Sequence, residues 1–116
     1  MFILQDKPYI KDLTISFDQS KFKFDFVKTA VEGIEKTLSG LPSVLFLDLK
    51  IGDIASHQVC RYLRSRHETK RIPIVVLAGV DTPKHYLFWA MELGANDYLI
   101  EPIDELALQD KIKKFA

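Results

Sequence analysis

The sequence is poor in the features that mark several large classes of protein. Its 116 residues include one cysteine, Cys60, which excludes an internal disulfide framework and fits a reducing compartment. Basic and acidic residues number 16 each, so no excess charge favours nucleic acid or an anionic membrane. The apolar N-terminal stretch, residues 1–4, is too short for a signal peptide or a spanning helix. We therefore expect a single cytoplasmic domain, residues 1–116, with no direct contact to nucleic acid or membrane.

Motifs of common catalytic and nucleotide-binding classes are also missing. Neither GxGxxG nor GxxxxGK[ST] occurs, which disfavours a nucleotide-binding protein. The three histidines, His57, His67 and His85, are far apart and none pairs with Cys60 at the spacing of a metal site. No Ser-His-Asp arrangement can be assembled from the ends of the predicted strands. We do not expect an enzyme.

The stretch Val44–Asp48 is the most informative part of the chain. Four apolar residues run directly into one carboxylate, between Pro42-Ser43 and Gly52. An apolar run of this length indicates a strand that is buried on both faces. Because an ionised carboxylate is costly in a strand interior, Asp48 is expected at the carboxyl end of the strand, where open parallel sheets bind their ligands.

Hydrophobic periodicity predicts five strands that alternate with five helices. Strands are expected at 2–4, 22–26, 44–48, 72–78 and 97–100, and helices at 8–17, 27–38, 54–66, 83–93 and after an Asp104 cap. Asp81 or Thr82 is the expected N-cap of helix 83–93, and Gly40 with Pro42 is expected to close helix 27–38. This alternation predicts an α/β, flavodoxin-like three-layer sandwich: a parallel sheet in the order 2-1-3-4-5, with two helices on one face and three on the other.

The predicted strand order brings several polar residues to one edge of the sheet. The first and third strands are neighbours, so Asp6 and Asp48 should lie together, while Ala78 and Glu101 reach the same edge from the last two strands. Two carboxylates and a backbone carbonyl suit Mg²⁺, and Asp48 could act as a nucleophile that forms an acyl phosphate. The alternative is that Asp6 and Asp48 are only the polar ends of strands.

Four stretches of the sequence carry a resemblance to a known family. They are 4–8 (LQDKP), 44–51 (VLFLDLKI), 72–79 (IPIVVLAG) and 94–102 (GANDYLIEP). In order and separation they resemble the receiver domain of bacterial two-component response regulators, of the chemotaxis-receiver type, over essentially the whole chain.

The resemblance implies a role for several residues of this sequence. Asp48 would accept a phosphoryl group from a histidine kinase or a phosphotransfer protein. Asp6, Asp48 and the backbone carbonyl of Lys50 would hold Mg²⁺. Tyr98 matches an aromatic residue that moves between outward and inward rotamers, and the peptide bond before Pro102 matches one that is cis in the family.

The sequence departs from the family at the residues of the phosphorylation pocket. Gln5 replaces one of two acids, Ala78 replaces the hydroxyl that bonds the phosphoryl group, and Glu101 replaces the lysine that pairs with it. The pocket therefore holds three acids, Asp6, Asp48 and Glu101, and no lysine. Like charges about 4 Å apart repel by roughly 4 kcal/mol at an effective dielectric constant near 20, so a phosphoryl group at Asp48 would be disfavoured. Glu101 is expected to be protonated, turned to solvent or engaged with a cation.

Three hypotheses for the function follow. The first is an atypical receiver that is phosphorylated at Asp48 with Mg²⁺ near Asp6. The second is a pseudo-receiver, which keeps the fold as a protein-interaction module and no longer responds to phosphate; Ala78 and Glu101 favour it slightly. The third, a metal-dependent phosphatase or phosphotransferase that uses the three acids, is the weakest because no general acid or substrate pocket can be named.

Helix 83–93 is apolar nearly all round, which is unusual for a helix with a solvent-facing side. One interpretation is a thoroughly buried helix. The other is that some of Leu87, Trp89 and Tyr98 form an exposed apolar patch that binds a partner or a second copy. The resemblance agrees with the second interpretation, because receivers commonly use the surface formed by this helix, strand 97–100 and the last helix.

Overall fold

A computed structural model describes residues 1–3, 8–15, 17, 21–50 and 52–115. These residues form five parallel strands in one sheet: β1 (Phe2–Ile3), β2 (Phe26–Val27), β3 (Leu45–Asp48), β4 (Ile74–Ala78) and β5 (Asp97–Ile100). The order is β2-β1-β3-β4-β5, which confirms the predicted topology. In register, Leu47 pairs with Ile3 of β1, and Asp48 pairs with Leu77 of β4, so β3 is the central strand.

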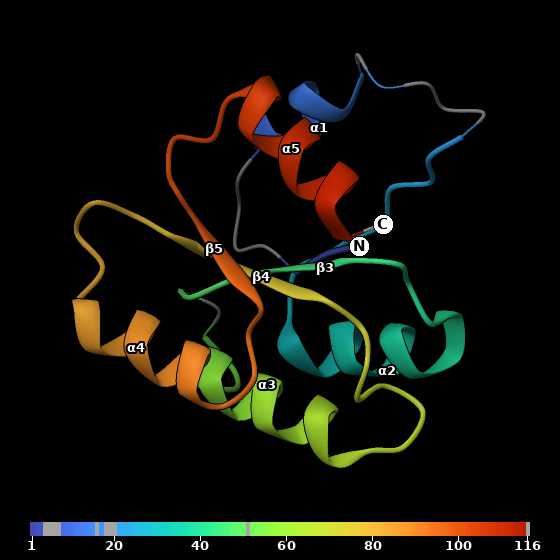
Figure 1. The fold of residues 1–116 in the computed structure, drawn as a ribbon, viewed down its shortest axis with the longest axis vertical. Helices are drawn as coiled ribbons and strands as arrows, with labels where there is room; N and C mark the ends of the chain where they lie inside the picture. The colour runs from blue at the N-terminus through green and yellow to red at the C-terminus, as the bar shows by residue number, and fades with distance from the viewer. Residues whose placement is uncertain (4–7, 16, 18–20, 51, 116) are drawn as a thin grey trace.

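The helices cover both faces of this sheet, as predicted. They are α1 (Pro8–Ile15), α2 (Ala30–Gly40), α3 (Ser56–Ser65), α4 (Lys84–Glu92) and α5 (Glu105–Phe115). In Figure 1, α1 and α5 lie on one side of the sheet, and α2, α3 and α4 lie on the other. Among the described residues no helix has both the length and the apolar character that a membrane span requires.

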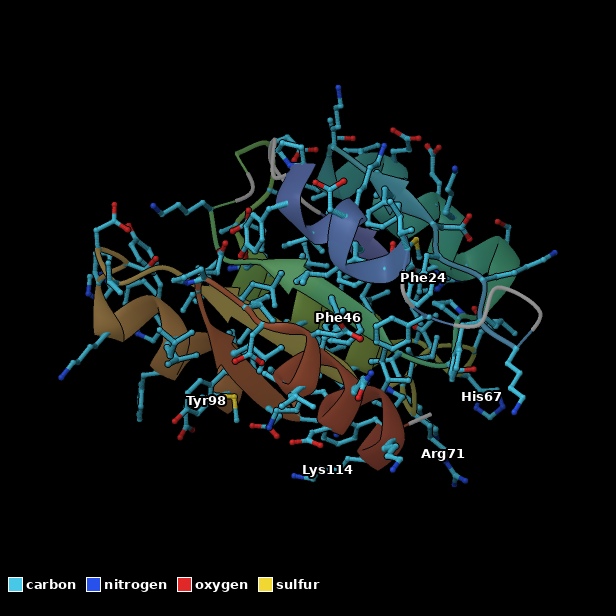
Figure 2. The ribbon with its side chains drawn as sticks, turned by 90° about the horizontal axis from the view of Figure 1, so that it is seen from above. Phe24, Phe46, His67, Arg71, Tyr98 and Lys114 are labelled. Atoms are coloured by element: carbon cyan, nitrogen blue, oxygen red, sulfur yellow. The ribbon has the colours of Figure 1, made fainter. Side chains whose placement is uncertain are left out.

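Alternation along the strands divides the core in two. Ile3, Leu45 and Leu47 point into the layer under α2, α3 and α4, whereas their neighbours Phe2 and Phe46 point toward α1 and α5. The rings of Phe2 and Phe46 stack with centroids 4.6 Å apart, and Phe46 lies in the middle of the molecule in Figure 2. Because both faces are covered, β3 and β4 are buried along their whole length, as their unbroken apolar sequence predicts. Cys60 lies in the first of these layers, where burial raises the pKa of its thiol to about 11.

The predicted edge strand at 22–26 is wrong in its extent. Only Phe26–Val27 pairs with β1, with Phe26 opposite Phe2 and Val27 opposite Ile3. Phe22 and Phe24 precede the strand and still alternate with exposed neighbours, and both pack against the layer that contains Phe2. The alternation therefore reflects aromatic burial, which needs no continuous ladder of hydrogen bonds.

The ends of two helices also differ from the prediction. Helix α2 ends in a left-handed residue, but this residue is Leu41 (φ 44°), whose N–H donates to the carbonyl of Thr37. Helix α4 begins at Lys84 with Pro83 in the N-cap position, and the predicted caps Asp81 and Thr82 do not cap it. The Thr82 hydroxyl instead accepts a hydrogen bond from the Gly79 amide at 2.9 Å, so it closes the preceding turn. The predicted Asp104 cap of α5 is confirmed: its Oδ1 accepts from the Ala107 amide at 2.8 Å.

Candidate functional site

Asp48 is positioned by the end of the central strand. Its side chain is fully buried, at 0% exposure, and its Oδ1 accepts a hydrogen bond from the Lys50 amide at 2.9 Å. Its backbone carbonyl accepts from the Ser56 hydroxyl at 2.8 Å, which ties the strand end to the first residue of α3. The turn after β3 therefore folds back on the Asp48 carboxylate and brings Lys50 to the same edge.

Ala78 and Glu101 reach this edge from the next two strands. Ala78 ends β4 and pairs with Ile100 of β5, and the Glu101 amide donates to its carbonyl at 2.8 Å. The peptide bond from Glu101 to Pro102 is cis, as the resemblance implied. The predicted juxtaposition of Asp48, Ala78 and Glu101 at one sheet edge thus follows from the observed strand order.

Glu101 is held by a residue that sequence reasoning missed. The Tyr9 hydroxyl on α1 donates to Glu101 Oε2 at 2.8 Å and accepts from the Ile103 amide at 3.3 Å. Burial raises the pKa of Tyr9 to about 12, and the negative charge of Glu101 acts in the same direction. Glu101 is half-buried, so its carboxylate is anchored toward α1 and is not simply turned to solvent.

The side chain of Lys50 supplies a cation that the sequence analysis did not count. Its Nζ lies 2.9 Å from Asp81 Oδ1 and 3.0 Å from Oδ2. The hydrogen bond to Asp81 raises the pKa of Lys50, and the charges of Asp81, Asp48 and Glu101 raise it further. The family's lysine position is Glu101 here, and the lysine near this edge, Lys50, comes from the loop after β3 and is paired with Asp81.

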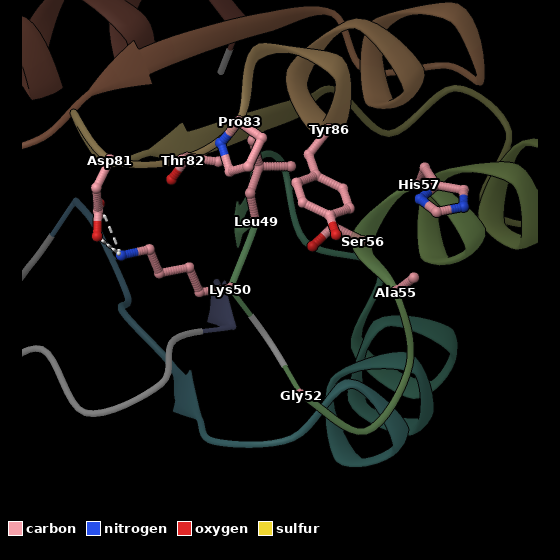
Figure 3. Close-up of a pocket in the computed structure, with 10 residues that line it drawn as sticks. All are labelled: Leu49, Lys50, Gly52, Ala55, Ser56, His57, Asp81, Thr82, Pro83 and Tyr86. Atoms are coloured by element: carbon pink, nitrogen blue, oxygen red, sulfur yellow. Dashed lines mark hydrogen bonds and ion pairs between the residues drawn. The ribbon is translucent and has the colours of Figure 1, made fainter.

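A cavity of about 450 Å³ opens beside this ion pair. Figure 3 shows the side chains around it, with Lys50 and Asp81 joined on one side and Tyr86 and His57 on the other. Its walls come from the loop after β3, the start of α3 and the loop that leads into α4. The cavity is thus bordered by the two loops that leave the central strands β3 and β4.

The metal prediction extends beyond the described residues. Within the described part of the chain, no three His, Cys, Asp or Glu side chains are grouped so that they could hold a metal ion. Gln5 and Asp6 lie outside the described residues, so a ligand set of Asp6, Asp48 and the Lys50 carbonyl stays a prediction. The oxygen donors of Asp48 and Lys50 are of the kind that Mg²⁺ prefers.

Helix α4 is not thoroughly buried, and the first interpretation of its composition is wrong. Of its nine residues, all of which the structure describes, only Ala90 is buried. Trp89 is 42% exposed and Phe88 61% exposed, whereas Leu87 is half-buried and packs against the core. Tyr98, 44% exposed, lies near the periphery of the view in Figure 2. Trp89 also contacts His57 and His85, with ring centroids 5.3 and 4.8 Å apart.

The strand order and the carboxylate at the end of β3 define a flavodoxin-like α/β domain with its site at the carboxyl edge of the sheet. The chain belongs to the response regulator receiver domain family, whose model matches residues 1–113. One relative, the transcriptional regulatory protein BtsR of Escherichia coli K12, is 32% identical over 98% of this chain and 46% of its own length. This chain covers 48% of another relative, the YclJ protein of Bacillus subtilis. The chain thus spans about half the length of the curated relatives it matches.

Solved structures confirm the fold. A two-component response regulator from Clostridium difficile superposes with a TM-score of 0.82 at 24% identity, covering 97% of this chain and 90% of that one. The receiver domain of the sensor histidine kinase PA1611 from Pseudomonas aeruginosa, solved with a magnesium ion in its active site cleft, also gives 0.82. It is 17% identical and covers 98% of this chain and 93% of that one. At these identities the likeness establishes the fold alone.

Proposed function

We propose that this receiver domain accepts a phosphoryl group on Asp48 from a histidine kinase or a phosphotransfer protein in the cytoplasm. Asp48 Oδ would attack phosphorus as the P–N bond of the donor phosphohistidine breaks. The electron pair of that bond stays on the imidazole nitrogen, which takes up a proton, and an acyl phosphate forms on Asp48. The site acts as a phosphoryl acceptor in signalling and does not turn over a substrate as an enzyme would.

The observation that carries this proposal is the placement of Asp48 and Lys50. The carboxylate stands at the end of the central strand with the Lys50 amide on Oδ1, and the ammonium of Lys50 lies at the same edge. This ammonium is paired with Asp81, and a positive charge released there would offset part of the repulsion between the carboxylates and an incoming phosphoryl group.

Mg²⁺ is the cofactor that these residues would accept. Asp6, Asp48 and the backbone carbonyl of Lys50 would hold it, and all three provide hard oxygen donors. When bound, Mg²⁺ supplies charge neutralisation at the phosphoryl oxygens. The magnesium ion in the cleft of the Pseudomonas receiver domain supports this choice of metal.

Intact mass spectrometry tests the proposal directly. The protein is incubated with acetyl phosphate and Mg²⁺, alongside Asp48→Asn, which keeps the size of the side chain and removes the nucleophile. A mass gain of one phosphoryl group in the wild type and not in the variant is the expected result. If a folded wild type with Mg²⁺ gains no mass, or if Asp48→Asn gains as much, the proposal is wrong.

A pseudo-receiver is the second candidate, and two observations favour it. Asp48 is completely buried, and Ala78 offers no hydroxyl at the end of β4. In this case the domain would act through a surface on α4, β5 and α5 that includes Trp89 and Tyr98, with Leu87 at its inner margin. It would bind a protein partner or a second copy of the chain. Sedimentation of the wild type and Trp89→Ala with and without acetyl phosphate tests the homodimer, which should form without phosphate and weaken in the variant.

A further inference from the structure

The ion pair between Lys50 and Asp81 connects two loops at the edge of the sheet. Lys50 follows β3, and Asp81 lies between β4 and α4. The Nζ of Lys50 contacts both carboxylate oxygens of Asp81, at 2.9 and 3.0 Å, as the dashed lines in Figure 3 show. Phosphorylation of Asp48 does not by itself require an ion pair between Lys50 and Asp81.

The backbone of Lys50 is fixed beside the Asp48 carboxylate. Its own amide is already bonded to Asp48 Oδ1 at 2.9 Å, so the flexible four-carbon side chain is rooted beside that carboxylate. The ammonium also lies close to the end of β4, because a Cβ added to Gly79 would be 3.6 Å from Nζ. A rotation of this one side chain would exchange Asp81 for an anion on Asp48.

The exchange is favoured by what the site lacks. Ala78 and Glu101 provide neither a hydroxyl nor a cation for a phosphoryl group, whereas the Lys50 ammonium lies in the loop directly after β3. Its present bond is weak, because the side chains of Lys50 and Asp81 are 46% and 73% exposed and exposed ion pairs contribute little. A phosphoryl dianion offers more charge than a single carboxylate.

We propose that Lys50 leaves Asp81 to pair with the phosphoryl group on Asp48, and that this exchange reports phosphorylation to α4. The inference rests on the proposed function, since it needs an acyl phosphate at Asp48. Asp81 is two residues before Pro83, the N-cap residue of α4, so the loss of its bond to Lys50 changes the contacts of the loop that positions this helix. Trp89 in α4 contacts His57 in α3 and is the only tryptophan, so its fluorescence reports the position of α4.

Three variants test the exchange with the phosphodonor assay. Lys50→Met removes the charge and keeps the length of the side chain, Asp81→Asn breaks the ion pair from the other end, and Lys113→Met removes an exposed charge on α5 as a control. Each protein is mixed with acetyl phosphate and Mg²⁺. The rate of adduct formation is followed by intact mass, and Trp89 fluorescence is recorded before and after. Circular dichroism checks that each variant is folded.

Lys50→Met should form the adduct about 5- to 10-fold more slowly, as expected for the loss of one partly screened charge, and its adduct should show no change in Trp89 fluorescence. Asp81→Asn should form the adduct at least as fast as the wild type, with fluorescence that resembles the phosphorylated wild type before any donor is added. Lys113→Met should match the wild type. If the wild type forms the adduct and Lys50→Met matches it in rate and fluorescence, the exchange is refuted and the proposed function stands. If the wild type forms no adduct, both fail together.

Discussion

Replacing Arg64 with methionine should lower the free energy of unfolding by about 3 kcal/mol. The guanidinium of Arg64 on α3 donates to the backbone carbonyls of Gly94, Lys70 and Ile72, at 2.8, 3.1 and 2.6 Å. It also donates to Asn96 Oδ1 at 2.6 Å. One side chain thus joins α3 to two other segments, the one that leads into β4 and the one that leads into β5.

The magnitude follows from which of these bonds are shielded from water. The bonds to Gly94 and Ile72 are partly buried, and each contributes about 1.5 kcal/mol as a hydrogen bond with a charged donor. The other two are exposed, so water replaces them at little cost. Partial burial also lowers the pKa of Arg64, which is the expected effect of desolvating a cation. Methionine keeps most of the apolar stem, so the loss measures the hydrogen bonds more than the packing.

Urea denaturation followed by circular dichroism measures this loss. Arg61→Met on the exposed face of the same helix is the matched control and should change stability by less than about 0.5 kcal/mol. Arg64→Lys should lose about 2 kcal/mol, because one ammonium cannot reach all the acceptors of the planar guanidinium. An Arg64→Met protein within 0.5 kcal/mol of the wild type would refute the reasoning, since the bonds to Gly94 and Ile72 would then contribute nothing.

Three further predictions concern other parts of the chain. Leu41→Gly should raise the free energy of unfolding by about 0.5 kcal/mol in urea denaturation, because glycine relieves the left-handed conformation of an exposed leucine; a destabilised variant would contradict this. Tyr9→Phe should lower it by about 1 kcal/mol, because Glu101 loses its hydrogen bond, and an unchanged denaturation midpoint would show that water substitutes fully for the hydroxyl. Partial burial raises the pKa of Asp97, but hydrogen bonds, chiefly from Lys111, outweigh it, and the pKa of Asp97 is lowered. The ionised Asp97 therefore contributes stability above its unfolded pKa, and this contribution is lost as the pH falls through the lowered pKa of the folded state. Asp97→Asn should therefore flatten the loss of stability below about pH 4 in thermal melts; a profile that parallels the wild type would count against this.

The prediction succeeded where the signal is local in the sequence. The run Val44–Asp48 and the apolar strand before Gly79 identified β3 and β4 because burial on both faces demands unbroken apolar residues. The strand order then placed Asp48, Ala78 and Glu101 at one edge. Boundaries were less accurate: β2 is shorter than its aromatic alternation suggested, because Phe22 and Phe24 pack against the core without pairing with β1.

The interactions that only the tertiary structure reveals join residues far apart in the chain. Tyr9 bonds to Glu101 across 92 positions, and Lys50 bonds to Asp81 across 31. Asp53 also caps α2 from the loop after β3, where its carboxylate accepts from the amides of Ala30 and Val31 at 2.8 and 3.0 Å.

The sequence by itself determined the class of fold, the family and the carboxylate at the end of the central strand, because hydrophobic periodicity and short motifs are properties of neighbouring residues. The tertiary structure decided which charges meet at that carboxylate's edge. Lys50 and Asp81 each follow a different strand and come together only when β3 and β4 pair. The charge balance of the site depends on this long-range contact, so a comparison of pocket positions along the sequence missed the lysine.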